Sequence, residues 1–300
     1  MLDPTQIKSP VVRARIEAIP ALAAFIDAVA GEVDGAPQDF WRCETPLTTL
    51  LASGFVADLL AYELRRLRVE SDYLPSGNGE SDLEIFQLGA LSFSIHLFLS
   101  PMQIGHPALF GLCEHKLICN LGPGPIRLEP WRQSGAEPSD VLDRNALLEP
   151  LPARLIAPGE RFRLEAHRDV ARYGAVDAPA AILSLTRERV TRLRWIYDAN
   201  TLAPTRLEGA GSTASRIEYA CALLVALGYT DAAPVIASLY DHPDHFVRWS
   251  AVRRTMDLDR ALGRELVERA TSDAHPHVQR AAIRSLERLR ARRASHTQED

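Results

Sequence analysis

Histidine and cysteine side chains able to bind a metal ion recur on several segments in the middle of the chain. The candidates are His96, Cys113, His115 and His167. In "LCEHKLICNL", Cys113 and His115 are two residues apart, so on a strand their side chains share one face and point into a barrel together. Imidazole nitrogens and thiolates are common ligands of divalent transition metals. The sequence therefore predicts a metal site wherever the fold brings at least three of these side chains together.

Each candidate also has a structural interpretation. A histidine among apolar neighbours, such as His115, is often a core residue, because a lone imidazole binds a metal only where further ligands converge. Cys113 is a small buried side chain in the same interpretation. His167 shares the charged face of "ERFRLEAH" and reaches an interior site only if a bulge or a strand end turns it inward. Both interpretations stay open for all four candidates.

Short strands over residues 83–207 must position these side chains. Runs of alternating apolar and polar residues are divided there by Gly and Pro: "LEIFQLG", "LSFSIHLFL", "HKLICNLG", "IRLEPW", "ARLIAPG", "RFRLEAH", "AAILSLT" and "VTRLRWIYD". Parallel pairing needs crossover helices, for which these short connections leave little room. The pattern predicts an antiparallel barrel or sandwich.

The strand region resembles the second motif of cupins, small barrels that often hold one metal ion with histidine and carboxylate ligands. The resemblance rests on the L-x-x-PGE turn at residues 155–160, the following strand and His167. "CEH" is the nearest match to the usual first motif, whose two histidines and glutamate are missing. The resemblance implies a divalent metal, with iron as the first candidate, held by His115, His167 and His96 or Cys113. It also implies a small-molecule ligand and an oxygenase or isomerase reaction.

Residues 1–82 predict helices that pack on the barrel. Ser9 is a suitable N-cap before Pro10, Pro20 is expected to kink or split the first helix, and Gly31 is expected to end it. A second helix is predicted over residues 45–70, and a turn-rich linker follows at 72–82.

Residues 213–293 contain an internal repeat. Two apolar columns recur every 31 residues, formed by Ala220, Ala251 and Ala282 and by Leu227, Leu258 and Leu289. This segment resembles short HEAT-like repeats, which implies a stack of helix pairs and a docking surface for a protein. The four histidines of the two His-Pro turns are interpreted as turn residues whose pairs need not converge: His242, His245, His275 and His277.

Composition and charge limit the classes of protein to which the chain can belong. The chain has 46% hydrophobic and 24% charged residues, which is typical of a globular protein. No apolar run is long enough to span a bilayer, and four scattered cysteines favour a reducing cytoplasm. Lys8 and Lys116 are the only lysines among 34 basic residues, a bias that indicates a GC-rich bacterial genome. Residues 213–293 carry 13 basic and 10 acidic residues, and a net charge of +3 is too small to favour nucleic acid as a partner of the repeat arginines.

Together these patterns predict an α+β multidomain chain. Its segments are N-terminal helices (1–82), an antiparallel cupin-like barrel or sandwich (83–212), a HEAT-like α-solenoid (213–293) and a disordered tail (294–300). One hypothesis is a metal-dependent small-molecule or peptide-modifying oxygenase of the cupin type, whose repeats dock a protein. The alternative is a non-catalytic ligand-sensing or interaction scaffold. A homodimer paired through an edge strand is an expected assembly.

Overall fold

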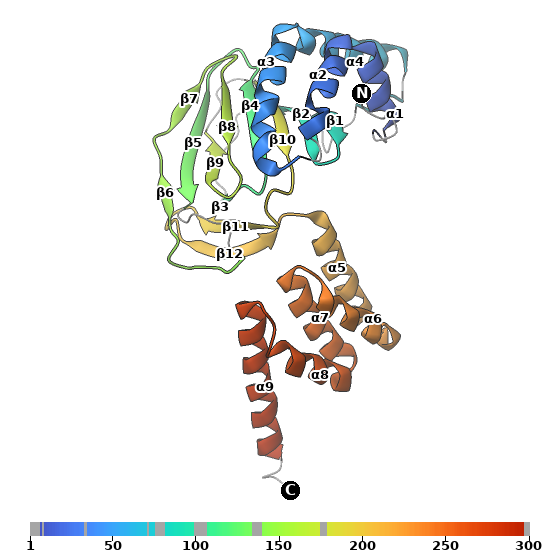
Figure 1. Cartoon of the computed structure of the whole chain (residues 1–300), viewed down its shortest axis with the longest axis vertical. Helices are drawn as coiled ribbons and strands as arrows, with labels where there is room; N and C mark the ends of the chain where they lie inside the picture. Colours follow the sequence, from blue (N-terminus) through green and yellow to red (C-terminus); the bar gives the residue numbers. More distant parts are fainter. Residues whose placement is uncertain are drawn as a thin grey trace. The chain divides into compact units, whose positions relative to one another are not determined.

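Two compact units make up the chain in the computed structural model (Figure 1). The first comprises residues 1–138 and 142–208, and the second comprises residues 139–141 and 209–300. The structure describes residues 7, 9–32, 35–70, 72–75, 82–98, 107–133, 140–174 and 179–296. The four-segment division stays a prediction, and residues 297–300 of the predicted tail lie outside the described residues.

Helices form the beginning of the first unit. They are α1 (Pro10–Ala18), α2 (Pro20–Val29), α3 (Glu44–Ala52) and α4 (Phe55–Val69), with 3-10 segments η2 (Ala30–Glu32) and η3 (Pro37–Cys43). Ser9 caps α1 by accepting the N–H of Val12, and Pro20 separates α1 from α2 as the sequence predicts. The helix predicted over 45–70 is divided at Gly54, whose φ of 81° is left-handed.

No single helix among the described residues meets the requirement of length and apolarity for a membrane span. The segments Pro37–Ala52 and Phe55–Val69 meet it only as a pair, with a bend of 66° between them.

The strands of the first unit form three sheets. Their bounds are β1 (Asp82–Leu88), β2 (Leu91–Phe98), β3 (Ala108–Phe110), β4 (His115–Asn120), β5 (Ile126–Gln133), β6 (Leu148–Pro150), β7 (Arg154–Ile156), β8 (Arg161–Leu164), β9 (Asp169–Tyr173), β10 (Ala180–Arg187), β11 (Leu193–Asp198) and β12 (Pro204–Gly209). The orders are β1-β2-β10-β4-β8, β12-β11-β3 and β6-β5-β7, with β9 paired to β5. The pairs with a defined register are antiparallel, as predicted.

The five-stranded sheet buries apolar side chains on both faces. Its outer face packs against the N-terminal helices, where Phe93 of β2 lies 5.4 Å from Phe25 of α2, ring centre to ring centre. Its inner face packs against the four-stranded sheet through Ile118, Phe162, Ile182, Ile126, Leu128 and Ile156. Because successive strand residues point to opposite faces, β4 directs Leu117 and Cys119 to the helices and Ile118 inward.

A buried ion pair ties the helices to this sheet. The Nε of Arg15 lies 2.6 Å from the carboxylate of Glu63, and Arg15 has an exposed fraction of 0%. Its guanidinium also donates to the backbone carbonyls of Glu84 and Ile85 in β1, at 2.6 and 2.9 Å. Tyr73 donates its hydroxyl to the other oxygen of Glu63 at 2.7 Å. These bonds satisfy charges that would otherwise be costly to bury.

The second unit is helical. Its elements are α5 (Ser212–Ala226), η4 (Thr230–Ala232), α6 (Ala233–Ser238), η5 (Leu239–Asp241), α7 (His245–Leu258), α8 (Arg260–Ala270) and α9 (Pro276–His296). Two members of the alanine column, Ala251 in α7 and Ala282 in α9, are fully buried, whereas Ala220 in α5 is exposed. The 31-residue spacing therefore coincides with helix packing at α7 and α9.

Candidate functional site

His115 lies on the outer face of the five-stranded sheet. Its ring centre is 4.9 Å from that of Trp41 and 6.1 Å from that of Phe40, both in η3. Its Nδ1 accepts the N–H of Ala166 at 3.0 Å, and burial lowers its pKa. The prediction that His115 points into the barrel is wrong, because the N-terminal helices supply the apolar cover for this face.

Cys113 precedes β4 in a bend, so strand alternation does not pair its direction with that of His115. The buried thiol donates to the carboxylate of Glu114 at 2.7 Å. Burial and the charge of Glu114 raise the pKa of Cys113 to about 12. The thiol is therefore protonated near neutral pH, and it would have to release this proton to bind a metal as a thiolate.

His96 lies on the inner face of the sheet, opposite Ile182 of β10. Its Nδ1 pairs with the carboxylate of Asp82, and its ring meets Phe98 edge-on, with centroids 4.5 Å apart. The register places several hydroxyl groups on this same face, which we call the polar inner face: Ser92, Ser94, Ser184 and Thr186. The Asp82 contact fixes the orientation of the imidazole.

His167 follows the end of β8 and has a φ of 67°. The alternate residues of β8 point outward, since Arg163 pairs with Glu44 and lies 5.3 Å from the Trp41 ring centre. The charged face of "ERFRLEAH" is thus on the same side of the sheet as His115. The left-handed backbone at His167 takes it out of this alternation, and its N–H donates to the carbonyl of Leu112 at 2.7 Å.

The four predicted ligands do not form a group within the described part of the chain. Of these described residues, one set of three or more possible ligands has atoms that all lie within 4.8 Å of one another, and it lies elsewhere. The structure thus gives no support to a single ion shared by His96, Cys113, His115 and His167, and that site stays a prediction.

That set is in the helical unit, and we call it the histidine cluster: His245 at the start of α7, with His275 and His277 at the start of α9. The rings of His245 and His275 stack with centroids 3.6 Å apart, and the ring of His277 meets that of His275 edge-on at 5.2 Å. Asp140 adds a carboxylate, 3.7 Å from Nδ1 of His245 and 3.3 Å from Nε2 of His275. Three imidazoles and a carboxylate suit a divalent transition metal.

Two histidines have matching roles in the His-Pro turns. The Nδ1 of His275 accepts the N–H of His277 at 3.2 Å, and the Nδ1 of His242 accepts the N–H of Asp244 at 3.1 Å. His275 is 7% exposed, and its Nε2 lies 3.3 Å from the Asp140 carboxylate without forming a hydrogen bond within the described residues. A metal ion bound to this nitrogen would be a stronger partner than that contact.

Burial favours the neutral form of two of these rings. Burial, followed by the neighbouring His275, lowers the pKa of His245 to about 4. Burial also lowers the pKa of His277. Neutral imidazole is the protonation state that coordinates a metal, so no proton has to be removed from either ring at neutral pH.

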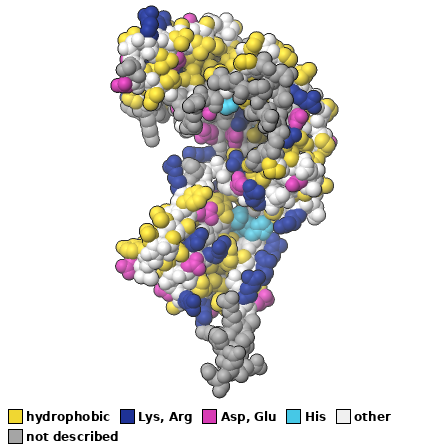
Figure 2. All heavy atoms as spheres, turned by 180° about the vertical axis from the view of Figure 1, so that it is seen from behind, with side chains coloured by type: hydrophobic (Ala, Val, Ile, Leu, Met, Phe, Trp, Pro, Cys, Tyr) yellow, Lys and Arg dark blue, Asp and Glu magenta, His cyan; other side chains and the backbone are white. Residues whose placement is uncertain are grey.

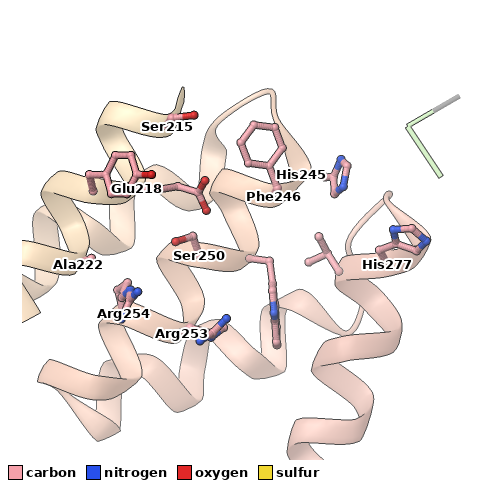
Figure 3. A pocket seen from close by; sticks show the side chains of 12 residues that line it. Ser215, Glu218, Ala222, His245, Phe246, Ser250, Arg253, Arg254 and His277 are labelled. Carbon is pink, nitrogen blue, oxygen red and sulfur yellow. The ribbon is translucent and has the colours of Figure 1, made fainter. Parts of the chain in front are cut away.

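A groove of about 530 Å³ lies beside the cluster (Figure 3). Its lining comes from α5, α7 and the start of α9: Ser215, Glu218, Tyr219, Ala222, His245, Phe246, Trp249, Ser250, Arg253, Arg254, His277 and Val278. Glu218 is hydrogen-bonded to Ser250, and the two side chains lie toward each other in Figure 3. The groove thus combines aromatic side chains, two arginines and two members of the histidine cluster.

The sequence did not indicate this convergence. Four histidines were expected to act in the turns, and His242 and His275 do so. The expectation that the pairs need not converge is wrong for His245, His275 and His277. The available signal was that both turns place a histidine at a helix start, and neighbouring helix starts lie close together when the helices pack in sequence order.

Comparisons with known proteins give no family. No family model and no curated protein matches the chain. It is similar to solved structures of a hydroquinone 1,2-dioxygenase from Sphingomonas (12% identity, 40% of this chain, 70% of that chain, TM-score 0.27), a DMSP lyase from Ruegeria pomeroyi (13%, 35%, 42%, 0.23) and a cupin superfamily protein from Desulfitobacterium hafniense (13%, 40%, 86%, 0.23). These values are too low to transfer a substrate, a metal or a residue role.

Proposed function

We propose that the protein is a metal-binding docking protein whose helical unit holds one divalent ion at the histidine cluster. The observation that carries the proposal is the convergence of His245, His275 and His277, with one ring nitrogen of each within 4.8 Å of the other two. The docking role follows the HEAT-like interpretation of residues 213–293, which is part of this proposal. A cytoplasmic location is also part of this proposal.

The hydrogen bond that His275 accepts in its turn opposes metal binding. Whether the metal binds depends on the free energy of that bond compared with the free energy of metal binding. In the neutral ring, an Nδ1 that accepts an N–H leaves the proton on Nε2, which lies 3.3 Å from the Asp140 carboxylate. Binding a metal at Nε2 moves this proton and weakens the cap on α9. A lost cap costs about 1 kcal/mol, whereas structural zinc sites supply about 10–16 kcal/mol. The metal term dominates.

Zinc is the ion that this donor set favours. Three imidazole nitrogens and one carboxylate oxygen are the number and kinds of donors that zinc takes in its four-coordinate protein sites. The stacked rings of His245 and His275 would have to turn for both to bind one ion. Iron, expected from the cupin resemblance, is the runner-up, since imidazole also suits iron. In this arrangement the ion would stabilise the starts of α7 and α9 together with the segment that carries Asp140.

Metal content of the purified chain tests the proposal. After zinc loading and removal of excess ion, we expect about one equivalent by mass spectrometry in the wild type and a large loss in His277→Ala and His245→Ala. His275→Ser retains a side chain that caps the helix but removes the ligand. His242→Ser makes the same change in the other turn, where no ligand is lost, and is the matched control. A full equivalent in His275→Ser and His277→Ala would overturn the site.

A second candidate is a metal-dependent small-molecule enzyme in the barrel. The observation that favours it is the polar inner face, where the imidazole of His96, oriented by Asp82, shares a surface with serine and threonine hydroxyls. The same measurement separates the candidates. Metal that is retained in His277→Ala and lost in His96→Ala would support the barrel site and contradict the helical one.

A further inference from the structure

We propose that the groove of the helical unit binds an acidic segment of a partner protein. The inference names the partner class for the proposed docking role and rests on that role, but it does not need the metal ion. It is carried by the arginines beside the groove, three of which form no ion pair within the described residues, and by the apolar side chains in its lining.

Cations flank the groove on two helices. Arg253 and Arg254 of α7 line it directly. On α9, His277 lines it, and Arg284 and Arg288 follow seven and eleven positions later, which places them on the same helix face. Helix α9 carries six arginines against one acidic residue, Glu287, although the whole chain has a net charge of −5. Figure 2 shows arginines gathered beside the histidines on one face of this unit.

The arginines around the groove differ from others of the unit in their partners. Arg248 pairs with Asp273 at 2.7 Å, and Arg269 pairs with Asp241 at 2.6 Å. Arg254 lies 3.8 Å from Asp257, whereas Arg253, Arg284 and Arg288 form no ion pair with any residue in the described ranges. Of these three, Arg253 still interacts electrostatically with Glu218. Guanidinium groups that lack an internal carboxylate are suited to bind carboxylates of another molecule in a bidentate manner.

The apolar side chains of the lining favour a peptide over nucleic acid. Phe246, Trp249 and Val278 contribute apolar surface to the lining, and Tyr219 of α5 is 76% exposed. A segment that alternates carboxylates with apolar side chains fits this arrangement.

Fluorescence anisotropy of the full chain with a short labelled peptide rich in Glu and Leu tests the inference. We expect saturable binding that weakens as salt is added, because surface charges are screened. The double variant R253E/R284E should weaken binding by about tenfold or more and should gain affinity for the corresponding Lys-Leu peptide. The matched control R260E/R264E reverses two arginines of α8 that do not line the groove, and it should bind the Glu-Leu peptide like the wild type.

Three results would overturn the inference. The first is that a Gln-Leu peptide binds as tightly as the Glu-Leu peptide, and the second is that R260E/R264E weakens binding as much as R253E/R284E does. The third is that a single-stranded oligonucleotide of the same charge binds more tightly than the Glu-Leu peptide, which would assign the groove to nucleic acid. The titrations are run with zinc and with chelator. If the chain binds no metal but still binds the peptide, the proposal for the groove stands and the proposal for the metal site fails. The two failures are therefore distinguishable.

Discussion

The imidazole rings of His245 and His275 stack face to face, with centroids 3.6 Å apart and planes 5° from parallel. Two protonated rings at this distance would repel each other, which agrees with the pKa of His245 falling to about 4 through burial and its neighbour. The contact joins residues 30 positions apart, one at the start of α7 and one beside the start of α9. Anything that binds both rings therefore stabilises the packing of these helices.

Zinc is expected to raise the melting temperature of the wild type. An ion that binds only the folded state at 100 times its Kd adds about 2.7 kcal/mol of stability. His275→Ser should lose this increment, whereas His242→Ser should keep it, although both replace a histidine that caps a turn. Calorimetry with zinc, magnesium and chelator measures the shift. The same shift in His275→Ser as in the wild type would contradict ligation by His275.

Arg15→Met is expected to be among the most destabilising substitutions in the first unit. It leaves Glu63 buried without its cation, and removing one partner of a buried pair costs about 3–5 kcal/mol. The double variant R15M/E63M removes both charges and should be more stable than the single variant. Urea unfolding followed by circular dichroism gives the two free energies. A double variant no more stable than R15M would show that the pair is not coupled.

Tyr73 makes the stability of this unit sensitive to high pH. Burial and the hydrogen bond to Glu63 raise its pKa from 10 to about 12. A raised pKa means that its contribution is fully present below pH 10 and is lost as the pH rises toward 12, because the unfolded chain ionises first. Y73F should be less stable near neutral pH by about 1 kcal/mol but should lose less stability over this interval. Urea midpoints against pH measure both slopes, and parallel slopes would contradict the assignment.

The sequence pattern predicts the strands of the first unit better than the direction of their faces. Alternation correctly groups His115, Leu117 and Cys119 on one side of β4. Both sides of this sheet are apolar, however, so hydropathy alone does not distinguish the face under the helices from the face inside the barrel. The choice depends on which long-range partner packs on each face, and that information is not local in sequence.

The repeat pattern does not predict the histidine cluster, and the reason is a different one. The alanine and leucine columns recur every 31 residues, but His242 and His275, which have the same role, are 33 positions apart. The His-Pro turns are therefore out of phase with the helices that they precede. Only the packed helices show that His245 and His277, from unequal positions in the two turns, lie near the same point.

Gly263 of α8 permits the close packing of α8 on α7. A Cβ at this position would lie 2.4 Å from the Cα and 2.7 Å from the N of Met256, both backbone atoms, so the helices would have to separate. Gly263→Ala should cost about 1–3 kcal/mol, which exceeds the gain of about 1 kcal/mol that alanine gives in a helix. Gly31→Ala is the comparison, because nothing lies within 4 Å of its added Cβ, and it should be neutral or stabilising. Urea unfolding distinguishes them, and equal effects of the two substitutions would contradict a steric role for Gly263.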